Sequence, residues 1–123
     1  MDILITSVLA IFGLIIGSFL NVVILRWNTG VRISKGRSVC FSCNKTLEWY
    51  ELVPLFSYVL QRARCLNCKT GISVQYPLVE LLGACSVPLA FYATPDVLTS
   101  IPAVISFVLT VTLFSFYIVL GVY

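Results

Sequence analysis

The chain has 123 residues, of which 59% are apolar and only 11% are charged. A soluble domain of this size is about one quarter charged, and a mean hydropathy of +1.02 excludes that class. The composition predicts a membrane protein.

Residues 3–25 form the first apolar stretch and contain no charged side chain. As a helix they reach about 34 Å, enough to cross a hydrocarbon core of about 30 Å. A signal peptide would have a basic start and a small-residue cleavage site, whereas this stretch follows Asp2 and precedes Arg26 and Trp27. We therefore expect residues 1–25 to form a retained transmembrane helix.

Small residues mark one face of this helix. Gly13 and Gly17 are four residues apart, and Asn21 lies one turn further along. This spacing lets two helices approach closely, and it favours packing against another helix of the same chain over self-dimerisation. Asn21 has two interpretations: it bonds to the neighbouring helix, or it lines a catalytic cavity.

The charges of the next segment predict its side of the membrane. All eight Lys and Arg residues lie between Arg26 and Lys69, where Glu48 and Glu51 are the only acids, so the formal charge is +6. Basic loops stay in the cytoplasm, which places the N-terminus and the 94–100 turn outside. A patch for nucleic acid or anionic lipid is the alternative. No repeated basic–aromatic alternation suggests base stacking, so no nucleic-acid partner is expected.

Residues 26–76 are too few to bury a self-sufficient core, and such domains usually need a staple. Two Cys-x-x-Cys pairs, 21 residues apart, supply one: Cys40, Cys43, Cys65 and Cys68. Four thiolates can surround Zn²⁺ tetrahedrally in a closed structural site. The sequence therefore predicts a cytoplasmic zinc-binding loop domain.

The sequence gives less support to other roles of these four cysteines. Reducing conditions in the cytoplasm oppose disulfides, and the βαβ pattern around a thioredoxin-like redox motif is absent. Unligated thiols are the remaining alternative. A fifth cysteine, Cys85, stands in "GACSV" and is expected to be a buried packing residue.

The segment between the cysteine pairs is rich in bulky aromatic residues: Trp49, Tyr50, Phe56 and Tyr58. Two interpretations stay open. These residues either form an interfacial segment that receives a substrate at the membrane surface, or they form the small core around the zinc site.

Residues 77–123 are expected to form a transmembrane hairpin. Its helices are predicted from Pro77 to about Ala93 and from about Val97 to Tyr123, with Pro95 and Asp96 as breakers in the turn between them. The fold class is thus an all-α membrane protein with three transmembrane helices and a zinc-stapled loop between helices one and two.

The order of motifs is specific. "GLIIGSFLNVVILR" precedes the first Cys-x-x-Cys, "LEWYELVPLFSYVLQRARC" leads to the second, and "ISVQYPLVELL" follows. This pattern resembles the N-terminal portion of type IV prepilin peptidases, the leader peptidases of pili, type II secretion and competence pseudopili. The segment "WYELVPLFSY" is similar to the corresponding sequence of the competence-type enzymes of Gram-positive bacteria.

The resemblance implies a polytopic protein of the bacterial plasma (inner) membrane. Family members are aspartic endopeptidases that remove prepilin leaders on the cytoplasmic side, and many methylate the new N-terminus with S-adenosylmethionine. Their four loop cysteines bind zinc, and these match the four cysteines of this loop. The chain departs modestly, with Gln75 where many relatives have Arg and Ala63 where many have Gly.

The protease chemistry does not carry over. An aspartic protease needs two carboxylates that share a proton, but the only aspartates are Asp2 and Asp96, and neither stands in a family motif. In relatives, a stretch like "FYIVLGVY" directly precedes the first catalytic Asp. We therefore expect no catalytic residue in this chain, which alone should be inactive as a protease, and a C-terminal catalytic region of the same protein as its partner.

Three glutamates are candidate contacts for the basic prepilin leader: Glu48, Glu51 and Glu80. For Glu80, three residues after Pro77, an N-terminal helix-capping role is the preferred alternative. Two rival functions remain: a non-catalytic, zinc-stabilised membrane module that binds a partner, and a membrane thiol oxidoreductase.

Overall fold

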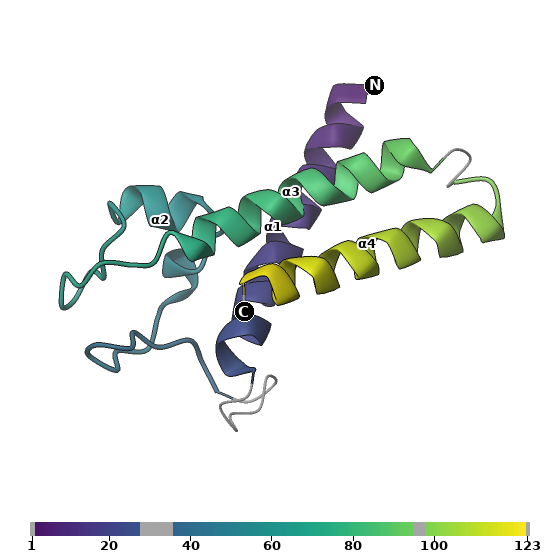
Figure 1. Ribbon diagram of the computed structural model, residues 1–123. Helices are drawn as coiled ribbons and strands as arrows, with labels where there is room; N and C mark the ends of the chain where they lie inside the picture. Colours follow the sequence, from purple (N-terminus) through teal and green to yellow (C-terminus); the bar gives the residue numbers. More distant parts are fainter. Residues whose placement is uncertain (1, 28–35, 95–97, 123) are drawn as a thin grey trace.

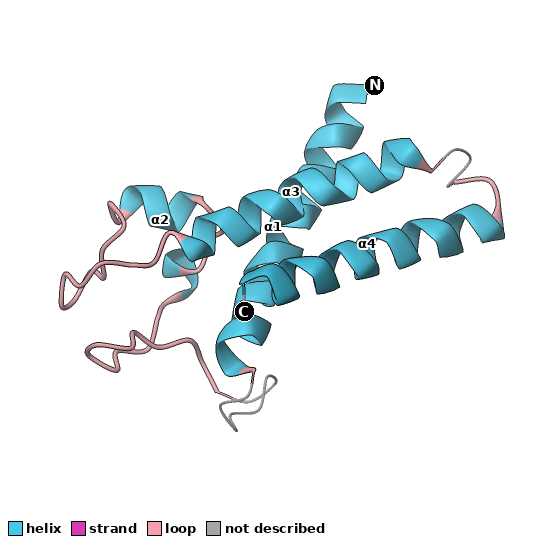
Figure 2. Cartoon of the chain, in the orientation of Figure 1, coloured by secondary structure: helices cyan, strands magenta, loops and turns pink. Residues whose placement is uncertain are grey.

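The computed structural model describes residues 2–27, 36–94 and 98–122, and the regular secondary structure in these ranges is helical (Figure 1, Figure 2). They contain no strand, only two isolated β-bridges in the loop. The elements are α1 (Asp2–Arg26), the 3-10 helix η1 (Trp49–Glu51), α2 (Phe56–Leu60), α3 (Gln75–Ala93) and α4 (Ile101–Val122). The predicted all-helical fold is confirmed.

Three of these helices are long and apolar enough to cross a membrane: Ile3–Arg26, Gln75–Ala93 and Ile101–Gly121. The second span begins at Gln75, two residues before the predicted start. The Ser73 hydroxyl accepts a hydrogen bond from the Gln75 N–H at 3.2 Å and so supports this earlier first turn. The turn residues Pro95 and Asp96 lie outside the described residues.

Helices α1 and α3 pack against each other in antiparallel orientation. Successive contacts run up α1 and down α3: Thr6 with Tyr92, Gly13 with Gly83, Gly17 with Glu80, and Asn21 with Tyr76. A Cβ atom on Gly13 would collide with the Gly83 carbonyl oxygen, and one on Gly17 would lie 2.6 Å from the Glu80 Cα. The predicted packing of the glycine face within the chain is confirmed.

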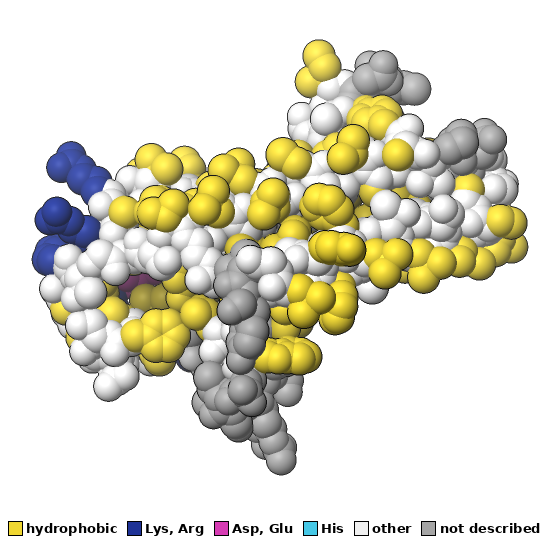
Figure 3. Space-filling view, viewed as in Figure 1, with side chains coloured by type: hydrophobic (Ala, Val, Ile, Leu, Met, Phe, Trp, Pro, Cys, Tyr) yellow, Lys and Arg dark blue, Asp and Glu magenta, His cyan; other side chains and the backbone are white. Residues whose placement is uncertain are grey.

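The small hydrophobic core lies on the loop side of the bundle, where all three long helices meet. It consists of Leu20 and Ile24 from α1, Val79 from α3 and Ile118 from α4. Near the turn, the rings of Phe91 and Phe107 meet edge to face with centroids 6.2 Å apart. Helix α4 is therefore held beside α3 near both of its ends, while most of its surface is uncovered (Figure 3).

The expected capping role of Glu80 is wrong. Because α3 starts at Gln75, Glu80 lies in the second turn, and the first turn carries no acid. The Glu80 side chain is buried, and its carboxylate accepts a hydrogen bond of 2.7 Å from the Leu55 N–H. This residue therefore joins the loop to the membrane-spanning bundle.

The expected burial of Cys85 is also wrong. Its side chain is exposed on the outward face of α3, while the neighbouring Ser86 and Val87 are buried. The reason is the helical rotation: α3 turns Gly83, Val87 and Ala90 inward, and Cys85 falls between these rows.

Candidate metal centre

The two Cys-x-x-Cys segments fold into matching knuckles, residues 39–46 and 64–71, each closed by one antiparallel β-bridge. In the first knuckle, the Cys40 N–H donates to the Lys45 carbonyl at 2.9 Å and the Asn44 N–H to the Cys40 carbonyl at 2.8 Å. The second knuckle repeats both bonds, from Cys65 to Thr70 (2.9 Å) and from Lys69 to Cys65 (3.0 Å). The sequence similarity of the segments is thus a similarity of backbone structure.

The residue that follows each pair has a left-handed backbone, with φ of 55° at Asn44 and 61° at Lys69. Asparagine tolerates this conformation better than most side chains, whereas lysine adopts it only where its surroundings require it. The turn aims the two cysteine side chains of each knuckle toward the other knuckle.

The four thiol sulfurs come together. The Sγ atoms of Cys40, Cys43, Cys65 and Cys68 all lie within 4.8 Å of one another. Tetrahedral Zn²⁺ with Zn–S bonds of about 2.3 Å requires sulfurs about 3.8 Å apart, and the Cys40–Cys68 separation is 3.7 Å. A disulfide needs about 2.05 Å, and all five cysteines are free. The donor set fits a tetrahedral thiophilic metal ion.

Hydrogen bonds around the cluster favour the thiolate form at two of the ligands. The Thr70 side chain and backbone lower the pKa of Cys68 to about 6. The Asn67 side-chain amide lies 3.5 Å from the Cys43 sulfur and, with the Lys45 backbone N–H, lowers the pKa of that thiol. Because thiolates are the form that binds metal, these contacts prepare the cluster for an ion.

Lys45 lies beside the cluster but is paired elsewhere. Its ammonium group bonds both carboxylate oxygens of Glu51 at 3.0 and 3.1 Å, and Glu51 also accepts the Glu48 N–H at 2.9 Å. The Glu51 side chain is fully buried. Burial raises its pKa, but the Glu48 N–H and Lys45 lower it further, so the net direction is down. Glu51 thus ties η1 to the first knuckle.

Glu48 differs from Glu51 in being open to solvent. Its carboxylate lies 3.7 Å from the Arg37 guanidinium, and the Glu48 side chain is 47% exposed. Contacts of Glu48, Glu51 and Glu80 with a substrate stay a prediction. The structure keeps these three acids in different settings: one half-exposed beside Arg37, one paired within the loop, and one bonded to the Leu55 backbone.

A cavity of about 860 Å³ separates the loop from the ends of α1 and α3, and Figure 3 shows a hollow in the loop half of the molecule. Asn21, Gln75 and Glu80 line it together with the buried Cys65. Asn21 donates to the Tyr76 carbonyl at 3.0 Å. Its Oδ1 atom and the Gln75 Nε2 atom are buried without a hydrogen-bond partner among the described residues. The interpretation that Asn21 bonds to the neighbouring helix is therefore confirmed. Asn21 also lines a cavity, and a catalytic role of that cavity stays a prediction.

The aromatic residues of the loop do not form a common core. Trp49, Tyr50 and Phe56 are exposed, at 75%, 49% and 62% of their surfaces. Only Tyr58 is half-buried, and it lines the cavity. The structure therefore disfavours the interpretation that all four pack around the cysteine cluster.

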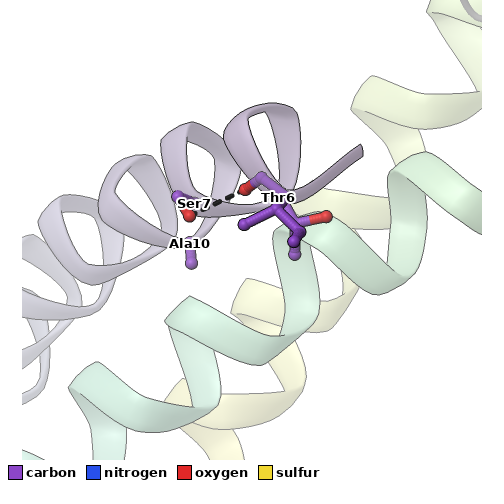
Figure 4. Close-up of a pocket in the computed structure, with 4 residues that line it drawn as sticks. Thr6, Ser7 and Ala10 are labelled. Carbon is purple, nitrogen blue, oxygen red and sulfur yellow. Dashed lines mark hydrogen bonds between the residues drawn. The ribbon is translucent and has the colours of Figure 1, made fainter. Parts of the chain in front are cut away.

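A second, shallower pocket of about 330 Å³ lies near the other end of α1 (Figure 4). Ile3, Thr6, Ser7 and Ala10 line it. The Ser7 hydroxyl donates to the Ile3 carbonyl at 2.7 Å, and the Thr6 and Tyr92 hydroxyls lie 2.6 Å apart. These hydroxyl groups thus have partners within the helix pair, as polar groups in a bilayer need.

Sequence reasoning missed several residues that shape this site. Gly83 completes the glycine contact, and the small residues of "LLGACS" were a usable signal for it. Thr70 and Asn67, which hydrogen-bond the thiol sulfurs, carried no signal of their own. The Leu55 N–H could not be found from sequence, because any residue there would supply one.

Comparisons with known proteins identify a family for most of the chain. Residues 11–94 match the family described as the bacterial peptidase A24 N-terminal domain. A prepilin leader peptidase/N-methyltransferase of Myxococcus xanthus is 53% identical over 74 residues, 60% of this chain and 22% of that protein. The same-named protein of Bacillus subtilis is 42% identical over 79 residues, 64% of this chain and 32% of that protein.

A third relative extends further along the chain. The type 4 prepilin-like proteins leader peptide-processing enzyme of enterotoxigenic Escherichia coli is 36% identical over 102 residues, 68% of this chain and 38% of that protein. The chain thus spans less than two fifths of the length of these three relatives. No solved structure matches the chain significantly. With the matched domain covering the helix pair and the cysteine loop, the chain belongs to the bacterial peptidase A24 N-terminal domain family.

Proposed function

We propose that this chain is the metal-stabilised N-terminal part of a prepilin leader peptidase, which removes the leader of prepilins at the membrane and methylates the product. The observation that carries the proposal is a four-cysteine cluster in the loop that connects two closely packed membrane-spanning helices, within a matched peptidase domain. The relatives named as N-methyltransferases support the second activity. S-adenosylmethionine would be its methyl donor.

The proposed metal is Zn²⁺, held by the four clustered cysteines. A bound zinc ion supplies structural cross-linking here, because four thiolates leave no open position for water or substrate. The chain's own contribution is to hold the ligands as thiolates, through Thr70 and Asn67, and to fasten the loop to the bundle through Glu80. The domain boundaries proposed are residues 1–25, 26–76 and 77–123.

The cleavage chemistry is assigned to carboxylates in the part of the relatives' length that these 123 residues do not cover. Asp2 and Asp96 are the only aspartates, and no pair of acids stands in the described loop as a proton-sharing dyad would. Glu48 is the best placed of the three glutamates to meet a basic leader, because its side chain is half-exposed while Glu51 and Glu80 are buried. The aspartic mechanism and any role in pilus, type II secretion or competence systems belong to this proposal.

Prepilin cleavage tests the proposal directly. Membranes that contain the product of the complete reading frame should cleave a prepilin and transfer a labelled methyl group from S-adenosylmethionine. Membranes with residues 1–123 alone should show neither activity, because each positioned acid or base contributes roughly 10²–10⁴-fold to the rate. Cleavage by the short chain would overturn the assignment of the chemistry. Inactivity of the complete product would favour a non-catalytic membrane module.

Orientation is a second prediction, with the loop proposed to face the cytoplasm of a plasma (inner) membrane. It rests on the confinement of all Lys and Arg residues to the segment between Arg26 and Lys69. Reporter fusions after Lys45 should be active only as cytoplasmic reporters, and fusions after Asp96 only as external ones. The reverse pattern would contradict the charge argument.

A further inference from the structure

The short helix α2 turns a purely apolar face outward. Phe56, Val59 and Leu60 stand at positions i, i+3 and i+4, so they share one side of the helix. They are 62%, 71% and 66% exposed. The opposite side carries Ser57 and Tyr58, which line the cavity beneath the loop. The described part of the chain therefore leaves this face uncovered.

The depth of α2 follows from its contact with α3. Helix α3 has 19 residues, which is about 28 Å and barely spans a hydrocarbon core of about 30 Å. It therefore cannot slide far along the membrane normal. Glu80 lies five residues after Gln75, the first residue of α3, and is therefore about 7 Å further along the helix into the membrane. Because the Leu55 N–H bonds the Glu80 carboxylate at 2.7 Å, α2 begins below the end of α3, at the depth of the membrane interface.

The backbone of this segment suits a site of low polarity. Its N–H groups find partners inside the protein: Leu55 on Glu80, Phe56 on Pro54, Ser57 on Val53, Val59 on Leu55, Gln61 on Ser57, Arg62 on Val59 and Ala63 on Tyr58. In lipid, an unsatisfied backbone group is strongly disfavoured, because no water is present to form the missing hydrogen bond. A segment with its donors satisfied internally avoids that cost.

The charges next to α2 have one sign. Arg62, Arg64 and Lys69 follow it and are exposed, and no acid occurs between Glu51 and Glu80. In the described ranges, the salt bridges are made by Arg37 and Lys45 instead. Figure 3 shows basic side chains gathered at the loop end of the molecule. This arrangement is complementary to anionic headgroups, because basic side chains near the membrane surface are attracted to them.

We propose that α2 is an interfacial anchor. The Phe56, Val59 and Leu60 side chains lie among the acyl chains just below the headgroups of the leaflet on the loop side, and Arg62 and Arg64 contact anionic headgroups. The bilayer thereby fixes the height of the cysteine loop above the membrane independently of its metal. Such an anchor would bind the membrane as interfacial amphipathic helices do, through the apolar area that it buries among the lipids.

Photo-crosslinking tests the anchor at single residues. The product of the complete reading frame, with p-benzoylphenylalanine in place of Val59, is reconstituted in vesicles of phosphatidylcholine and phosphatidylglycerol in equal amounts. After irradiation, mass spectrometry should find phospholipid adducts on the peptide that contains residue 59. The matched control replaces Phe41, an aromatic residue of the first knuckle that is 74% exposed, and should yield no lipid adduct above the unirradiated background. Adducts of residue 59 to another protein segment, or equal lipid adducts at both positions, would overturn the proposal.

A charge variant tests the headgroup contact separately. In the unaltered protein, adducts at residue 59 should be enriched in phosphatidylglycerol over the vesicle composition. The double variant Arg62→Gln and Arg64→Gln should keep the lipid adducts but lose this enrichment. Unchanged enrichment in the double variant would refute the role of the two arginines.

Discussion

Replacing Cys65 by serine is expected to release the metal from the purified protein, from about one zinc ion per chain to none. Cys65 is the most buried of the four clustered cysteines, at 4% exposure, so a water molecule cannot easily take the place of its sulfur. Structural zinc sites contribute about 10–16 kcal/mol in small peptides, comparable with the whole stability of a domain. The loop should therefore lose its fold, and elemental analysis together with protease sensitivity of the loop measures both effects.

Cys85→Ser is the matched control. Cys85 is exposed on α3 and lies outside the cluster, so this variant should keep its zinc and its loop structure. Stoichiometric zinc in the Cys65→Ser protein would contradict the four-cysteine site. Unaltered protein that has been kept under reducing, cytoplasm-like conditions and still contains two disulfides and no metal would contradict it equally.

Replacing Gly13 by alanine is expected to force α1 and α3 apart. The new Cβ atom would collide with the Gly83 carbonyl oxygen and lie 2.7 Å from the Gly83 carbonyl carbon and 2.9 Å from the Ala84 Cα. All three atoms belong to the backbone, so no side-chain rotation relieves the clash. We expect the free energy of unfolding to fall by about 3 kcal/mol, at the upper end of the cost of overpacking. The measurement is the unfolding midpoint in detergent micelles, which should be lower.

Gly121→Ala provides the comparison, since a Cβ atom at Gly121 would meet no atom within 4 Å. It should leave the unfolding midpoint unchanged or raise it slightly, because alanine favours the helix over glycine. Gly83→Ala should resemble Gly13→Ala, and the double variant should cost less than the two together, because both changes separate the same contact. An unfolding midpoint for Gly13→Ala equal to that of Gly121→Ala would contradict the observed approach of the helices.

The sequence by itself determined the class of the protein, its spans and its cluster of cysteines. Hydropathy over 19 or more residues is a local property, so the three membrane-crossing helices could be predicted from the apolar stretches along the chain. Two Cys-x-x-Cys pairs likewise carry their own geometry, because each pair brings its two thiols together within one turn. Gly13 and Gly17 predicted a close helix contact because small side chains have few other uses at that spacing.

Only the tertiary structure decided what these parts touch. Glu80 resembled a helix cap in sequence. Its hydrogen bond with the Leu55 N–H could not be predicted, because the two residues are far apart along the chain. Cys85 resembled a buried residue, yet its exposure depends on the rotation of α3 about its own axis. The aromatic segment around Phe56 allowed two arrangements, since a run of large apolar residues is equally suited to a core or to an interface. Which side of a helix faces the protein is set by contacts between segments far apart in sequence. The local sequence of one helix does not reveal those contacts.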